Sequence, residues 1–153
     1  MFSLIITIIA LLLFVAVLVA GINYIPASTV TTKETTTIVQ SGNSILANAL
    51  YAYRVTHDEF PEVTGWDTTL FPNYGKLPLA PSNMAWSYGT NGTGHYVCVS
   101  GSIDKSRFDG ISAAQGLYSD EYYVSDACGA EANGAIPSAY PAAIAATFWV
   151  TSP

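Results

Sequence analysis

The chain has 153 residues, of which 50% are hydrophobic and only 10% charged, whereas soluble proteins carry roughly 25% charged residues. This excludes an ordinary cytosolic domain, and the 10 Tyr and 3 Trp exclude a disordered chain. The net charge of −6 and five scattered bases make direct nucleic-acid binding unexpected. Since every charged residue follows Thr32, we expect a protein that is membrane-bound or assembled through its N-terminus.

The N-terminal segment is a run of large apolar residues from Phe2 to Ile22. As a helix it would span roughly 30 Å, the thickness of a bilayer core. Apolar residues lie on every face, so lipid or other apolar helices must surround it. We therefore predict a transmembrane or filament-core helix over residues 1–26. A cleavable secretory signal has a basic start, and none precedes this run, so we expect either processing upstream of Met1 or an anchor that is kept.

A second, amphipathic helix is predicted over residues 27–58, continuing the first. Pro26 interrupts between them and Gly21 loosens the same region. The helical period then resumes, and Pro61 stops the helix just after His57. Its apolar stripe is expected to consist of Ile38, Ile45, Leu46, Ala49, Leu50 and Tyr53. The opposite, polar face is expected to carry Glu34, Gln40, Asn43 and Arg54.

Residues 59–153 are predicted to form a β-rich globular head. Pro and Gly residues between Phe60 and Pro81 indicate a loop region around the helix. Two aromatic strands at 84–88 and 95–100 flank Asn91-Gly92, a hairpin signal. A short helical turn is expected at 112–117, and further strands at 121–124 and 147–150. The fold class is therefore α+β, with a small antiparallel sheet covering the apolar stripe of a long N-terminal helix.

Two cysteines, Cys98 and Cys128, lie 30 positions apart with no His or Cys at metal-ligand spacing. A redox or metal pair is one interpretation, but the exported character of the chain favours a structural disulfide. Such a bond would stabilise the head by about 3 to 4 kcal/mol on the chain-entropy model. It would also pin the segment from Ala130 to Pro153 to one side of the sheet.

The signals for catalysis are weak, and we predict neither an enzyme nor a bound cofactor or metal. His57-Asp58-Glu59 is more simply a solvated helix end than a metal site, and His95 adjoins a turn. Ser100-Gly101-Ser102 lacks the glycine spacing of a nucleophile elbow. The triplet Asn91-Gly92-Thr93 matches a glycosylation acceptor but is explained by the hairpin turn.

The order of these features resembles that of type IV pilins and type II secretion pseudopilins. The shared features are an N-terminal Phe-Ser-Leu-Ile, an uncharged apolar stretch, Pro26, a helix ending in Tyr51-Ala52-Tyr53, then Phe60-Pro61, an aromatic hairpin and two late cysteines. The resemblance covers the whole chain as architecture. As sequence it is specific in the first 25 residues and around Tyr53 to Pro61.

The resemblance implies a leader cleaved by a prepilin peptidase and N-methylation of the new first residue, Met1 or Phe2. It also implies that Gly21 and Pro26 mark a region that loses helical hydrogen bonds in the filament. The implied filament-core residues are Phe2, Leu4, Ile5, Ile8, Leu12, Val15, Leu18 and Ile22. One departure is that the family usually has Glu at the fifth mature position, where this chain has Ile5 or Ile6. This removes a costly buried carboxylate but leaves the terminal amine without its partner.

The function expected from the resemblance is that of a structural subunit of an extracellular, pilus-like helical filament. Its partners would be other copies of itself, the inner membrane before assembly and the pilus assembly machinery. Adhesion, motility, DNA uptake and conjugation are the uses open to such a fibre. The alternatives are a single-pass anchored binding domain outside the cell or in the periplasm, and a secretion pseudopilin.

Overall fold

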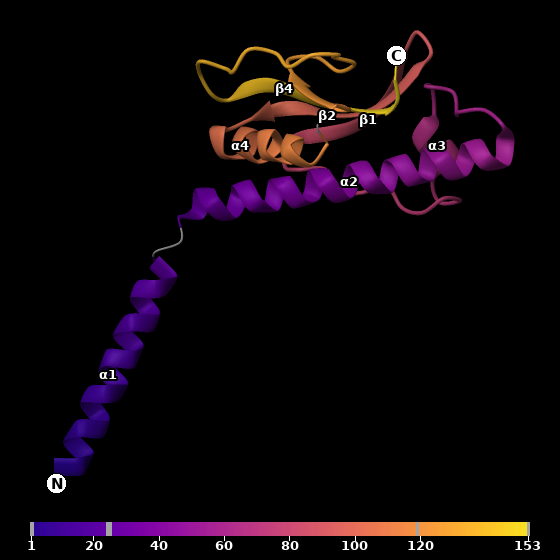
Figure 1. The fold of residues 1–153 in the computed structure, drawn as a ribbon. Coiled ribbons are helices and arrows are strands. Elements are labelled where there is room, and N and C mark those ends of the chain that lie inside the picture. Colours follow the sequence, from indigo (N-terminus) through magenta and orange to yellow (C-terminus); the bar gives the residue numbers. More distant parts are fainter. Residues whose placement is uncertain (1, 24–25, 119, 153) are drawn as a thin grey trace. The chain divides into compact units, whose positions relative to one another are not determined.

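The computed structural model describes residues 2–23, 26–118 and 120–152, without the side chains of residues 2–4 and 19–23 (Figure 1). The chain divides into two compact units, residues 1–30 and residues 31–153. The first unit contains the helix α1, Phe2–Asn23, and the first residues of α2, Ala27–His57. The second unit contains the rest of α2 and the whole head.

The head is built on a four-stranded antiparallel sheet in the order β1-β2-β4-β3. Its strands are β1 (Met84–Asn91), β2 (Gly94–Ile103), β3 (Tyr122–Ser125) and β4 (Ala142–Thr151). The helices α3, Trp66–Leu70, and α4, Lys105–Ala114, and the 3-10 turn η1, Gln115–Leu117, complete it. The α+β class and the hairpin are confirmed, but Asn91 pairs with Gly94, so the two turn residues are Gly92 and Thr93 instead of Asn91 and Gly92. Gly92 supplies the left-handed φ, 59°, that this tight turn requires.

The core lies between α2 and one face of the sheet. The register aligns Tyr88, Val97, Phe148 and Tyr122 in one row across all four strands, and these side chains are buried. From α2, Leu46 and Leu50 are fully buried in the same cluster. Burial of such side chains is the main force holding the helix to the sheet.

The helix α4 packs against α2 at very short range. A Cβ added to Gly110 would lie 2.6 Å from the backbone oxygen of Thr32, so only glycine permits this approach. Thr32 Oγ1 donates a 3.0 Å hydrogen bond to the backbone oxygen of Ser106, and Thr36 Oγ1 donates one of 2.8 Å to that of Gly110. The threonines near the start of α2 therefore hold α4 in place.

The predicted faces of α2 are correct for most residues, but two positions need correction. Buried as expected are Leu46, Ala49 and Leu50, and exposed as expected are Glu34 and Arg54. Asn43, expected on the polar face, is only 1% exposed, and Ile45, expected in the buried stripe, is 41% exposed. The buried face is rotated because Trp86 of β1 fills the space over Gly42, where an added Cβ would overlap the indole ring. Part of the buried face of α2 therefore consists of Gly42 and Asn43, which a search for large apolar residues does not find.

Three other expectations also differ from the structure. The loop between Phe60 and Pro81 contains the short helix α3. The helix predicted at 112–117 begins earlier, at Lys105, because Asp104 caps it by accepting a 2.9 Å hydrogen bond from the backbone N–H of Arg107. The predicted C-terminal segment, Ala130 to Pro153, lies on one side of the sheet only up to the start of β4 at Ala142. From there β4 lies inside the sheet, between β2 and β3.

Candidate functional surfaces

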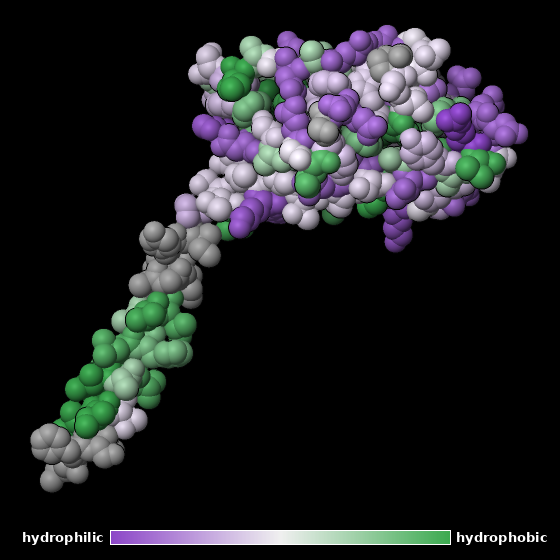
Figure 2. All heavy atoms as spheres, viewed as in Figure 1, coloured by the Kyte–Doolittle hydropathy of each residue, from purple (hydrophilic) through white to green (hydrophobic). Residues whose placement is uncertain are grey.

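The helix α1 presents apolar side chains to solvent all round. Every described side chain from residue 5 to residue 18 is exposed, and Figure 2 shows this part of α1 as almost uniformly hydrophobic. Among the predicted core residues, exposed fractions range from 48% to 64% for Ile5, Ile8, Leu12, Val15 and Leu18. An apolar surface of this kind is unfavourable in water and marks a site of burial against lipid or protein.

Other predicted residues of this segment are only partly described. Met1 lies outside the described residues, as do the side chains of Phe2, Leu4 and Ile22; the backbone of these three residues and of Gly21 belongs to α1. Pro26 directly precedes α2, and its carbonyl oxygen accepts a 2.9 Å bond from the Thr29 N–H. The helix α1 ends at Asn23 and α2 begins at Ala27. Within the described residues, no helix is both long and apolar enough to cross a membrane.

The solvent-facing side of α2 carries a short apolar line, here called the outer stripe. It consists of Ile45, Ala52 and Val55, all exposed. These residues are seven and three positions apart, so they share one face of the helix. Exposed Asn48 lies between Ile45 and Ala52 on that face and interrupts the line. The outer stripe points away from the side buried against the sheet, so α2 carries apolar side chains on two sides.

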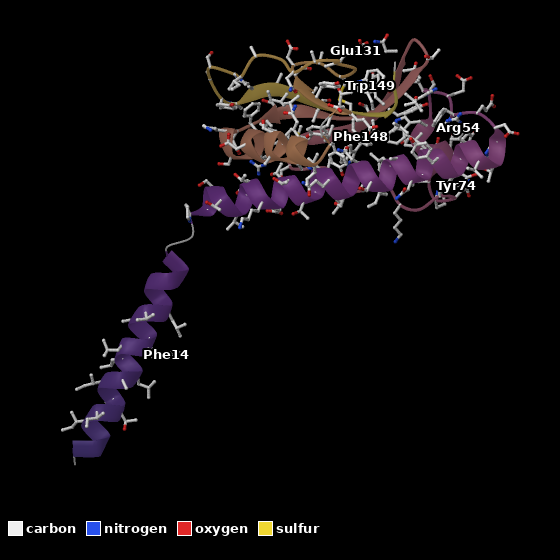
Figure 3. All side chains as sticks on the ribbon, in the orientation of Figure 1. Phe14, Arg54, Tyr74, Glu131, Phe148 and Trp149 are labelled. Atoms are coloured by element: carbon white, nitrogen blue, oxygen red, sulfur yellow. A yellow bond between two sulfur atoms is a disulfide. The ribbon has the colours of Figure 1, made fainter. Side chains whose placement is uncertain are left out.

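On the far side of the sheet from α2, residues 126–141 cover the strands (Figure 1). The predicted disulfide between Cys98 and Cys128 is confirmed and joins this covering segment to β2. The Trp149 indole N–H donates a 2.9 Å bond to the Ala130 carbonyl, and the Gly129 N–H donates a 3.0 Å bond to Thr147 Oγ1. Figure 3 shows Trp149 and Glu131 at this covered face. The covering segment is thus tied to two central strands.

The two histidines lie in aromatic surroundings. His57 is exposed and stacks on Tyr53, with ring centroids 4.0 Å apart, and the left-handed Asp58 (φ 61°) ends α2 beside it. His95 Nδ1 lies 2.5 Å from the Tyr88 hydroxyl, and its ring stacks on Phe60 at 4.1 Å. Burial, with a smaller contribution from the positive charge of Arg54, lowers the pKa of His95.

The residues considered above as metal ligands or as a nucleophile lie in settings that packing and strand structure explain. Within the described ranges, no three His, Cys, Asp or Glu side chains are grouped so that they could hold a metal ion. Ser100, Gly101 and Ser102 lie inside β2 rather than at a strand-to-helix turn, which is the setting that a nucleophile elbow needs. The Tyr88–His95 pair is explained by packing, since the tyrosine is 4% exposed.

A groove of about 770 Å³ opens at the β3 edge of the sheet. It is bounded by α4, the end of β3, the start of β4 and residues 133–138. Since β3 ends opposite Ala145, residues 142–144 of β4 have no partner strand on that side among the described elements. We call this hollow the β3-edge groove. No sequence pattern predicts it, because its walls come from four separate segments.

No protein-family model matches the chain, and neither a curated protein nor a solved structure matches it significantly. Four features of the molecule are therefore the candidates for its function: the apolar α1, the outer stripe of α2, the disulfide-tied covering segment and the β3-edge groove.

Proposed function

We propose that this protein is the structural subunit of a type IV pilus-like helical filament. One observation carries the proposal: residues 5–18 expose large apolar side chains on every face of a helix that is part of a charge-free segment. A surface of this kind has to be covered, and identical neighbouring helices would cover it completely. In the filament, α1 forms the axis and the head faces outward.

The driving force is burial of the α1 side chains. Withdrawing one large apolar side chain from water contributes roughly 1.5 to 3 kcal/mol. In this proposal the subunit waits in a membrane before assembly, because the uncharged run of residues 2–22 matches a bilayer core in length. Lipid is as apolar as the neighbouring helices, so the net gain on assembly comes from close packing and is smaller for each side chain.

The head fits this role in two respects. The outer stripe places apolar side chains on the exposed side of α2, which suits contact with the helices of neighbouring copies. The disulfide from Cys98 to Cys128 ties the covering segment to the sheet, as suits a protein exposed outside the cell. No catalytic step is part of this function.

The test is a charge in the middle of α1. Leu12→Asp should abolish filaments, since an uncompensated carboxylate would be buried among apolar side chains. Leu12→Met is the matched control: it preserves volume and apolarity and should assemble normally. Both variants are expressed in cells that make the filament, and sheared fibres are compared with the amount of subunit retained in the cell. Normal filaments from Leu12→Asp would contradict the proposal.

A further inference from the structure

The segment from Lys76 to Pro81 carries apolar side chains that its own molecule leaves uncovered. It lies outside any helix or strand. Leu79 is 86% exposed and Leu77 is 46% exposed. Pro78 separates them, and Pro81 ends the segment, so the backbone is held extended by the fixed φ of proline. Exposed leucines in a stiffened, extended segment are well suited to insertion into a groove, because little conformational entropy is lost on binding.

The β3-edge groove has the complementary chemistry. Its apolar walls include Phe108, Val124, Ile136, Pro137 and Ile144. Its two charged lining residues are both acidic, Asp109 and Asp126. Asp109 already pairs with Lys105 at 2.8 Å, whereas the described ion pairs do not include Asp126. An apolar segment that begins with a lysine would therefore match the groove in both polarity and charge.

The size of the groove also fits. Pockets of roughly 300 to 1,000 Å³ enclose most of a ligand with the dimensions of a few residues, and this one measures about 770 Å³. Ile136 at its rim is 78% exposed, so a bound segment would cover another apolar residue. Leu77, Pro78 and Leu79 together are of the size that such a hollow holds.

The segment leads into one edge strand of the sheet, and the groove lies at the other edge strand. Pro81 shortly precedes β1, and its carbonyl oxygen accepts a 3.0 Å bond from the N–H of Met84, the first residue of that edge strand. The groove lies at β3, the other edge strand. A molecule with complementary surfaces at two separate places joins to the next copy head to tail, and such contacts repeat along a ring or an open helix.

We propose that residues 76–81 of one copy insert into the β3-edge groove of the next copy, with Lys76 facing Asp126. This inference rests on the proposed filament and assigns one of its contacts between heads. Leu77 and Leu79 fill the apolar part of the groove. The contact is heterologous, so neither surface binds its own counterpart.

The direct test is cross-linking between copies of the full chain. Both native cysteines are joined to each other, so a short bismaleimide reacts only with added thiols. Copies carrying Leu79→Cys are co-expressed with differently tagged copies carrying Ile136→Cys, and assembled filaments are treated. The expected product is a dimer with one copy of each kind, and either variant alone should yield none.

Val63→Cys is the matched control for Leu79→Cys, because Val63 is an exposed apolar residue (44%) that belongs neither to the outer stripe nor to the proposed contact. Paired with Ile136→Cys it should give no cross-link. Filaments that form without any Leu79–Ile136 cross-link would overturn this contact and leave the filament intact. Cross-linking of Leu79→Cys to itself would show a symmetric contact and overturn the proposal as well. Failure to find any assembled copies would overturn both the contact and the filament.

A charge exchange tests the polar part of the same contact. Lys76→Glu and Asp126→Lys should each lower the yield of the Leu79–Ile136 cross-link about fivefold, the effect of one exposed ion pair of about 1 kcal/mol. The combination of both changes should restore it. Restoration distinguishes a direct contact from a folding defect, and a combined variant as weak as the single ones would contradict the pairing of these two residues.

Discussion

Gly42 lies where α2 passes over the indole ring of Trp86. Because an added Cβ would overlap that ring, Gly42→Ala should lower the free energy of unfolding by about 1 to 3 kcal/mol, the usual effect of overpacking a core. Thermal unfolding of Ser41→Ala, an exposed change on the same helix, should show almost no loss. If Gly42→Ala is as stable as the native chain, the close contact is wrong.

Asn43 is buried beside this contact, and its side-chain nitrogen has no hydrogen-bond partner among the described atoms. A buried donor without a partner costs about 1 to 3 kcal/mol. Asn43→Leu, which removes the donor, should therefore raise the free energy of unfolding by about 1 kcal/mol in a urea titration. If Asn43→Leu instead lowers the free energy of unfolding, the Asn43 amide stabilises the fold and the unpaired donor is not a net cost.

His95 links stability to pH. Burial and then Arg54 lower the pKa of this ring below its ordinary value of 6.5, so below that pH the unfolded chain binds a proton that the folded chain resists. Stability contributed by the neutral ring is therefore present above about pH 6.5 and is lost as the pH falls. Urea titrations between pH 8 and pH 5 should show the native chain losing more stability than His95→Gln. Parallel losses in both proteins would contradict this role.

At the scale of the elements, the covering segment depends on the Cys98–Cys128 disulfide for its attachment to β2. Replacing both Cys98 and Cys128 with Ala should lower the free energy of unfolding by about 3 to 4 kcal/mol. Hydrogen exchange should accelerate first at the Gly129 amide, which bonds to Thr147 Oγ1. If that amide stays as protected as the amides of β2, the hydrogen bonds alone would hold the segment.

The outer stripe of α2 should matter for assembly and little for folding. Ala52→Glu places a charge in the middle of that exposed face, so filaments should be lost while the melting temperature of the head changes little. Ala52→Met is the control, because methionine is close to glutamate in length and helix propensity but keeps the stripe apolar. Equal yields of sheared fibres from both variants would remove the outer stripe from the filament contacts.

The elements show how far the sequence could be used to predict the fold. The end of α2 near His57 and the hairpin at Gly92 were predictable because proline, glycine and aromatic patterns act locally. The placement of β4 beside β2 was not, since that pairing joins residues about 50 positions apart, with α4 and β3 in between. Most of the predicted stripe of α2 is buried or half-buried, including the fully enclosed Leu46, Ala49 and Leu50. Gly42 and Asn43 were missed, because they are buried by what packs on them and not by their own hydrophobicity.

At the scale of the whole molecule, the apolar α1 was predictable from composition alone, because charge is absent over the whole segment. The β3-edge groove was not predictable, since residues from 108 to 144 meet there only after the sheet has formed. In the proposed filament, the axis follows from the charge-free sequence of α1, whereas the contacts between heads follow from surfaces that only the structure shows.

The most direct test of the filament is electron microscopy of fibres sheared from cells that express the chain, at a resolution that identifies side chains. The account predicts a helical array of this subunit with residues 2–22 at the axis and the heads outside. It would be contradicted if the protein stayed in the membrane as a monomer while the fibres were made of another protein.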